Sequence, residues 1–213
     1  MGQHSWIFTL QQAAVDIFAV GELQKGAVVL ATSYTDDVIE KARLACLRSL
    51  EILDTESDER IDRVTRIAAE HFQVPIALVS LLDEDRQWFK SRVGIETRET
   101  PRCHAFCDHA IRRNGTMVVP NATQDDRFKD NPLVTGEPHI RFYAGAPITI
   151  DAQNIGTLCI IDSKPRNFFD TDVKKLESLA HAVHALISSR ANARNALARV
   201  EVNSSNAKAD SGQ

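Results

Sequence analysis

The stretch PIALVSLLDEDRQWFKSRV, residues 75–93, decides the fold of this chain. Its first part, from Pro75 to Asp83, is rich in leucine and β-branched residues and is bounded by a proline and by acidic residues, which predicts a buried strand. The acidic triplet at 83–85 predicts a tight turn, and the residues from Gln87 to Val93 show partial alternation of apolar and polar types. The stretch therefore predicts a β-hairpin.

A second hairpin is predicted further along the chain. Residues 141–148, RFYAGAPI, and residues 155–162, IGTLCIID, flank the turn-forming segment at 151–154. Short turns of this kind join antiparallel strands, because parallel strands need long crossover connections. Apolar residues at helical spacing precede the first hairpin, with Thr35 or Asp36 as the expected N-cap, and follow the second from about Asp170. This order predicts an α+β fold in which helices cover an antiparallel sheet.

Length and composition set limits on function. The 213 residues carry a formal net charge of −4, with 43% hydrophobic and 25% charged residues. That balance lacks the basic surface of a general nucleic-acid binder, so we expect no nucleic-acid partner. No apolar stretch approaches the ~20 residues that span a bilayer, and the four cysteines do not form a secreted disulfide pattern. We therefore expect a cytoplasmic protein with reduced thiols and no membrane association.

The chain divides into three parts. Residues 1–35 form an N-terminal arm whose order the sequence does not define, and we assign it no function. Residues 36–190 form one folded domain, and residues 191–213 form a helix end and a polar tail that we expect to be disordered. The last helix has an apolar seam at Val173, Leu176, Ala180, Val183 and Ile187. Arg190 and Arg194 then occupy the seam, either because this face leaves the core for solvent or because it packs on a partner.

Three features carry candidate chemistry. Residues 121–139 form a long irregular segment, and such segments in compact domains are usually functional. Residues 86–113 hold seven basic and three acidic side chains, which indicates either a solvated face or the recognition of an anionic ligand or acidic partner. The segment CHAFCDH at 103–109 places Cys103 and Cys107 at i,i+4 on an expected helix, where they could bind zinc or act as a redox pair. The structural interpretation is a buried Cys107 and a hydrogen-bonded His109.

Taken together, several short motifs resemble those of GAF domains of a bacterial signalling subtype, over roughly residues 40–190. The motifs are LEILDT at 50–55, DRVT at 62–65, PIALVSL at 75–81, RQWFKS at 86–91, FCDHAI at 106–111, DRFKDNP at 126–132, RFYAG at 141–145 and GTLCIID at 156–162, followed by Pro165 and Arg166. The resemblance implies a six-stranded antiparallel sheet with helices on one side, a ligand pocket on the other, and dimerisation through the first and last helices. Such domains lie N-terminal to histidine kinases and diguanylate cyclases. No such output segment fits after residue 190, so we expect the output to come from a partner.

From the residues and the resemblance we expect a stand-alone sensory or regulatory module of signal transduction. It would bind a small ligand of unknown identity or a signalling protein, form a homodimer, and not be an enzyme. The residues expected to face the ligand are Cys107, His109, Arg127, Phe128, Arg141, Tyr143 and Cys159. We assign no catalytic and no metal-binding residue, and the sequence identifies no cofactor.

Other members of the resembled family leave alternatives. A thiol-based redox enzyme similar to the free methionine sulfoxide reductases would use Cys103 and Cys107. A dimerisation scaffold would fill the pocket with its own side chains and bind no ligand. The Cys103-His104 dipeptide is similar to the bilin attachment site of photosensors, although it lies ahead of the expected helix. The spaced signature of cyclic-nucleotide GAF domains is absent, since Asn121 is followed by Ala122.

Overall fold

Two hairpins build the centre of the sheet. The structure is a computed structural model that describes residues 37–210, so the expected N-cap at residues 35–36 and the arm 1–35 lie outside the described residues. The strands are β1 (Ile76–Leu82), β2 (Arg86–Val93), β3 (Glu99–Pro101), β4 (Met117–Val119), β5 (Phe142–Ile150) and β6 (Gln153–Asp162). They form one sheet in the order β3-β2-β1-β6-β5-β4, and neighbouring strands are antiparallel. The predicted α+β fold with a six-stranded antiparallel sheet is confirmed.

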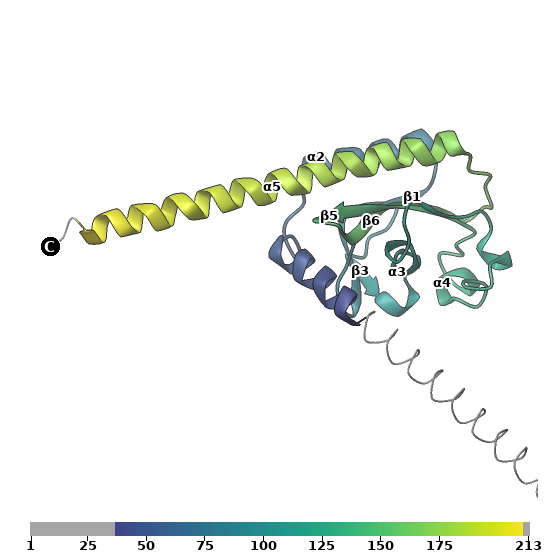
Figure 1. Cartoon of the computed structure of the whole chain (residues 1–213). Coiled ribbons are helices and arrows are strands. Elements are labelled where there is room, and N and C mark those ends of the chain that lie inside the picture. Colours follow the sequence, from purple (N-terminus) through teal and green to yellow (C-terminus); the bar gives the residue numbers. More distant parts are fainter. Residues whose placement is uncertain (1–36, 211–213) are drawn as a thin grey trace, which may run out of the picture. The chain divides into compact units, whose positions relative to one another are not determined.

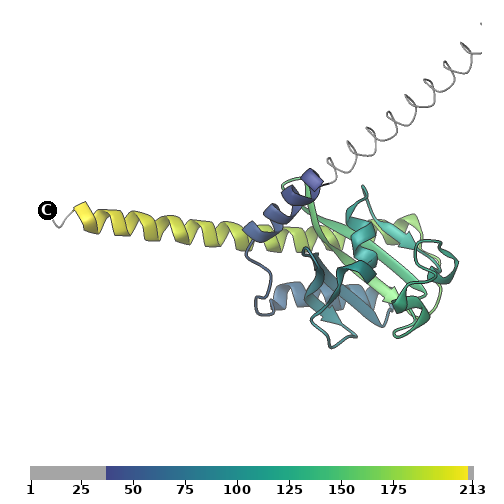
Figure 2. The same ribbon diagram turned by 90° about the horizontal axis from the view of Figure 1, so that it is seen from below.

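Helices cover both faces of this sheet. The described helices run over residues 37–49, α2 (Glu59–Phe72), α3 (Phe106–Ile111), α4 (Pro132–Thr135) and α5 (Asp170–Asp210), with 3-10 turns η1 (Arg102–His104) and η2 (Ala122–Gln124). α2 and α5 lie side by side on one face, and α3 and α4 lie on the other (Figure 1). Figure 2 views the molecule from the α3 side, with the sheet behind that helix.

The alternation of side chains along the strands creates two separate cores. In β1, Ala77, Val79 and Leu81 point toward α2 and α5, where they join Leu158 of β6 and Leu176 of α5. The intervening residues of β1 point toward α3 and its preceding and following segments. All seven β1 residues are buried, as expected for a strand covered on both faces. This explains why PIALVSLL reads as one apolar run.

A β-bulge interrupts the pairing of β1 with β2. Val79 pairs with Ser91 and Ser80 pairs with Phe89, which leaves Lys90 as the extra residue. A bulge places two consecutive residues opposite one residue of the partner strand and turns their side chains toward the same face. Lys90 and Ser91 are both buried in consequence, on the side of the sheet that α2 covers. Sequence alternation does not reveal this extra residue.

The two arginines in the seam of α5 have a role that neither sequence interpretation anticipated. Arg190 donates to the carbonyls of Leu50 and Glu51, each over 3.0 Å, and Arg194 donates to those of Ser49 and Leu50, each over 2.7 Å. These carbonyls lie at the C-terminal end of the helix over residues 37–49. Carbonyls at a helix end lack partners within the helix, and cationic side chains satisfy them well. The two arginines on this face of α5 therefore bind backbone carbonyls of the same chain.

α5 also continues further than expected. It runs as one helix to Asp210, although we expected residues 203–210 to be disordered. The segment from Asp170 to Asp210 contains neither glycine nor proline, so no residue in it breaks the helical pattern. Its last core residue with complete burial is Ile187, and the part beyond extends away from the sheet (Figure 1).

Candidate functional site

Two buried cysteines meet on the face of the sheet that α3 covers. Cys107 lies in the first turn of α3 and Cys159 lies in β6, and their sulfur atoms are 3.7 Å apart. Both thiols are free. Cys159 pairs with Leu78 of β1 and Gly145 of β5, which places it in the middle of the sheet beneath α3. The structure thus brings together two of the residues that the sequence predicted for the site.

Three hydroxyl groups surround this thiol pair. Tyr143 Oη donates to Cys107 Sγ over 3.3 Å, and Thr157 Oγ1 donates to the same sulfur over 3.2 Å. Ser80 Oγ lies 4.0 Å from Cys159 Sγ. We call Ser80, Cys107, Tyr143, Thr157 and Cys159 the thiol-hydroxyl cluster. All five side chains are buried, so polar groups form the floor of this face beneath apolar cover.

The thiol-hydroxyl cluster shifts the acidity of its two thiols in opposite directions. Burial raises the pKa of Cys107, but hydrogen bonds with Cys159, Thr157 and Tyr143 outweigh burial and bring it down to about 7. The pKa of Cys159 is raised well above its usual value by its hydrogen bond with Cys107 and by burial. Because the two thiols are in direct contact, their titrations are coupled.

Gly145 makes room for the tyrosine of the cluster. A Cβ atom at position 145 would lie 2.1 Å from Tyr143 Oη and 2.6 Å from the carbon that bears it. Tyr143 and Gly145 lie two residues apart on β5, on the same face of the sheet, and the tyrosine ring lies across the glycine toward Cys107. The RFYAG motif therefore has a steric basis in this fold.

Aromatic side chains close the cluster off from solvent. Phe106 and Phe128 stack with ring centroids 4.0 Å apart, and Phe106 also contacts Tyr143 at 5.3 Å. The His109 ring lies 4.9 Å from that of Phe128, edge to face, and the Arg127 guanidinium lies 4.9 Å from the same ring. Burial, together with the positive charge of Arg127, lowers the pKa of His109. An uncharged imidazole can pack on Phe128 without a desolvation penalty for charge.

Hydrogen bonds within and around residues 121–141 hold this aromatic cover in place. Asp125 accepts from the backbone N–H of Arg127 over 3.0 Å and forms an ion pair with its guanidinium at 2.6 Å. Asn131 donates to the carbonyl of His104 over 3.1 Å, which ties the segment to the residues before α3. Arg141 Nη1 donates to the carbonyls of Val134 and Ile140. Local hydrogen bonds around Asp125 thus organise this segment.

The structure places the seven predicted site residues in three roles. Cys107, Tyr143 and Cys159 form part of the cluster floor, and His109, Arg127 and Phe128 form the cover above it. Arg141 instead stabilises the segment that carries the cover. Sequence reasoning missed Ser80 and Thr157, although a hydroxyl residue at an inward position of an apolar strand is a usable signal, since buried hydroxyls need partners.

The proposed pairing of Cys103 with Cys107 is wrong in its geometry. Cys103 is exposed in η1, whereas Cys107 is buried in α3. Ala105, with φ −77° and ψ 120°, adopts an extended conformation that separates η1 from α3. The two cysteines therefore do not share one helix face.

The basic stretch 86–113 forms several ion pairs within the chain. Arg86 contacts Asp54, Asp83 and Glu99, with distances of 2.6 to 3.3 Å. Asp108 accepts from Arg102 at 2.7 Å and from Arg112 at 3.1 Å. Part of the local positive charge is thus compensated by acidic residues, and one of these, Asp54, comes from a distant part of the sequence.

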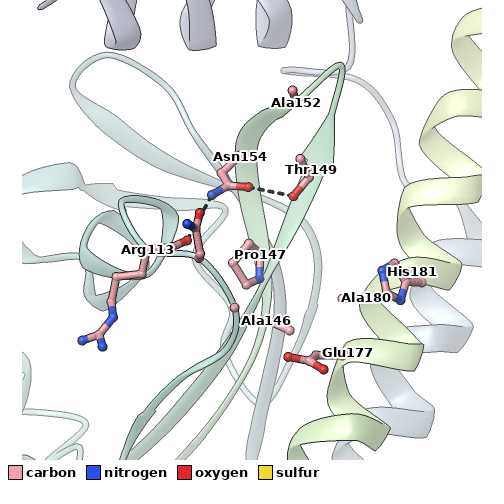
Figure 3. A pocket seen from close by; sticks show the side chains of 11 residues that line it. Arg113, Ala146, Pro147, Thr149, Ala152, Asn154, Glu177, Ala180 and His181 are labelled. Atoms are coloured by element: carbon pink, nitrogen blue, oxygen red, sulfur yellow. Dashed lines mark hydrogen bonds between the residues drawn. The ribbon is translucent and has the colours of Figure 1, made fainter. Parts of the chain in front are cut away.

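A cavity of about 480 Å³ lies away from the thiol-hydroxyl cluster, between the end of the β5–β6 hairpin and α5 (Figure 3). Glu177 points from α5 toward the strands and accepts from Thr116 over 2.9 Å. Asn154 donates to the carbonyl of Ile111 over 2.9 Å and accepts from Thr149 over 2.7 Å. The lining of this cavity includes none of the seven residues that the sequence predicted.

Comparisons with known proteins agree with this architecture. The GAF domain of a phosphoenolpyruvate-protein phosphotransferase from Acinetobacter is 19% identical, with a TM-score of 0.53, over 70% of this chain and 93% of that one. The free methionine-R-sulfoxide reductase of Neisseria meningitidis is also 19% identical, with a TM-score of 0.54, over 68% and 87% of the two chains. At these identities the likeness shows the fold alone.

The fold is that of a family of sensory and regulatory modules. The model of the GAF domain family matches residues 56–187, and the chain belongs to that family. A cyclic di-GMP phosphodiesterase of Pseudomonas aeruginosa is 46% identical over 156 residues, which is 72% of this chain and 26% of that protein.

The match to the phosphodiesterase corrects one expectation. We expected a protein that is not an enzyme, but this relative is named for an enzymatic activity. The chain spans about a quarter of the length of that enzyme. In residues 37–210, no helix combines the length and the apolar character that crossing a membrane requires.

Proposed function

We propose that this chain is the ligand-responsive regulatory module of a cyclic di-GMP phosphodiesterase system. The observation that carries the proposal is the back-to-back arrangement of the thiol-hydroxyl cluster and α5 on the same two strands. Tyr143 and Cys159 face α3, while their neighbours Phe142 and Leu158 belong to the core that includes α5. The identity of 46% to a cyclic di-GMP phosphodiesterase supports the choice of signalling system.

The ligand in this proposal is a small molecule that replaces Phe128 above the cluster. It would stack a planar apolar group on Phe106 and place a polar atom near Cys107 and Thr157. Its entry requires residues 121–140 to move outward, because Phe128 is 1% exposed in the closed arrangement. The ligand shifts the module toward the open arrangement only if it binds that state more tightly. The movement of β5 and β6 then changes how α5 packs.

We propose in addition that two copies associate through α5, in the cytoplasm. Leu197 supports this, because it lies on the part of α5 beyond the sheet and is 67% exposed. When an apolar helix of a second copy covers this leucine, apolar surface is removed from water, and this favours association. Leu197→Glu should convert a dimer to a monomer in light scattering, with Asn195→Glu as the exposed control. A Leu197→Glu protein with the native mass of a dimer would contradict this part of the proposal.

Native mass spectrometry of the freshly purified chain tests the ligand. A bound molecule adds mass that disappears on denaturation, and its release allows its identification. Thr157→Val removes one hydroxyl of the cluster floor with little change in volume and should reduce the bound fraction. Thr171→Val, at an exposed position of α5, serves as the matched control. Recovery of the bare chain only, under conditions that preserve weak complexes, would favour the scaffold alternative.

Exchange of this module into the Pseudomonas phosphodiesterase tests the regulatory role. The chain would replace the segment of that enzyme which it matches, and cyclic di-GMP hydrolysis would be measured. We expect activity that changes when Thr157→Val is introduced and does not change with Thr171→Val. Equal hydrolysis in both variants, with and without the released molecule, would count against regulation through this site.

A further inference from the structure

A second cavity lies on the face of the sheet that α2 covers, opposite the thiol-hydroxyl cluster. It has a volume of about 490 Å³, and we call it the α2 cavity. Its lining comes from three segments, namely the start and outer side of α2, the end of β2, and the residues after β2. The lining residues are Ser57, Asp62, Arg66, Lys90, Ser91, Arg92, Val93, Ile95 and Glu96.

The β-bulge supplies the most buried polar groups of this cavity. Because the bulge turns Lys90 and Ser91 toward the same face, both line the cavity although they are consecutive in a strand. Lys90 is 4% exposed and Ser91 is 3% exposed. Bulges often re-aim side chains in this way next to functional sites.

The Ser91 hydroxyl has no hydrogen-bond partner among residues 37–210. A buried hydroxyl without a partner costs free energy, so native proteins rarely keep one unless a ligand or water uses it. The Lys90 ammonium donates to Thr55 Oγ1 over 2.8 Å and to the carbonyl of Glu56. Since an ammonium has three donors, one N–H remains for a further acceptor. Ser91 and Lys90 thus offer two adjacent donors at the base of the cavity.

The rim of the α2 cavity carries both signs of charge. Arg66 and Arg92 contribute positive charge, and Asp62 and Glu96 contribute negative charge. Arg66 is partly neutralised by Glu59 at 2.5 Å. Together with Lys90 at the base, the lining holds three cationic and two anionic side chains. A molecule with one carboxylate and one ammonium group meets a complementary partner for each, whereas phosphate leaves the two carboxylates of the rim without a cationic partner on the ligand.

We propose that the α2 cavity binds a small zwitterionic carboxylate of the amino-acid type. Its carboxylate accepts from Ser91 and Lys90 at the base, and its ammonium group lies against Asp62 at the rim. The site is separate from the one under residues 121–140, because the sheet lies between them. A negative result in the test of one site therefore leaves the proposal for the other site standing.

Ligand-observed NMR with the full chain tests the proposal. The probes are the twenty standard L-amino acids, with succinate and inorganic phosphate as comparison anions. We expect at least one amino acid to bind, with affinity about tenfold lower or more in Ser91→Ala, since a hydrogen bond to a charged group is worth roughly this much. Ser178→Ala, at an exposed position of α5, should leave the affinity unchanged.

Two further measurements make the result decisive. Ser91→Ala should unfold at the same urea concentration as the wild type or a higher one, because the hydroxyl that it removes has no partner in the described part of the chain. Asp62→Asn should lower the affinity for the amino acid and leave the affinity for succinate unchanged. The proposal is overturned if no amino acid binds, if phosphate binds better than every amino acid, or if Ser91→Ala leaves the affinity intact.

Discussion

At the scale of single residues, the candidate site depends on the space above one glycine. Replacement of Gly145 by alanine places a methyl carbon 2.1 Å from Tyr143 Oη, so the tyrosine must leave its position over the sheet. Overpacking of a core in this way typically costs about 1–3 kcal/mol. We expect Gly145→Ala to lower the free energy of unfolding in urea by that amount. An alanine variant as stable as the wild type would show that the Tyr143 side chain can adopt another conformation without loss of stability.

The hydroxyl of Tyr143 offers a second residue-scale prediction. It donates to Cys107 Sγ and so stabilises the thiolate, whose pKa is about 7. Tyr143→Phe removes that donor and should raise the pKa of Cys107, which ultraviolet absorbance of the thiolate would report. A Cys107→Ser protein provides the baseline. An unchanged titration in Tyr143→Phe would mean that Cys159 and Thr157 support the thiolate without the tyrosine.

At the scale of elements, α5 stabilises the end of an earlier helix through its two arginines. Arg194→Ala leaves the carbonyls of Ser49 and Leu50 with fewer donors, and Arg190→Ala does the same for Leu50 and Glu51. Each single change should cost about 1 kcal/mol, because these groups are partly exposed to water. Arg199→Ala, exposed further along α5, is the control. Hydrogen exchange should also become faster at residues 49–51 in the two variants.

These elements show what the sequence can and cannot predict. The hairpins follow from the alternation and turn residues of PIALVSLLDEDRQWFKSRV, which are local signals. The contacts of Arg190 with Leu50 join residues 140 positions apart, and no local pattern encodes such a pairing. The bulge at Lys90 adds one residue to β2, and the residue types of that strand give no local signal for it. Six of the predicted site residues do lie together, because their motifs all pack on the face of the sheet that α3 covers.

At the scale of the whole molecule, carboxylates paired with arginines link stability to pH. Hydrogen bonds from Arg112 and Arg102 lower the pKa of Asp108 despite its burial, and arginine partners lower the pKa values of Asp54, Asp58 and Asp125. A lowered pKa in the folded state means that the unfolded chain binds more protons in acid. Stability is therefore complete above the unfolded pKa of about 3.9 and falls as the pH drops through the folded values.

Asp108→Asn tests this dependence on pH. The variant should be less stable at neutral pH by about 1 kcal/mol, since two arginine contacts are weakened. Its urea midpoint should also fall less steeply than that of the wild type between about pH 5 and pH 3. Asp130→Asn, at an exposed position, should follow the wild type. Parallel curves for Asp108→Asn and the wild type would rule out a role for this carboxylate in acid unfolding.

The strand order has a consequence for how the chain folds as it is made. β1 ends at Leu82, but its second neighbour, β6, begins only at Gln153. During synthesis the first hairpin can form early. The other edge of β1 stays unpaired until about seventy more residues have been synthesised. An apolar strand edge left open is prone to pair with other chains. The closing of β6 onto β1, which joins the two hairpins, is thus the step at which aggregation competes most directly with folding.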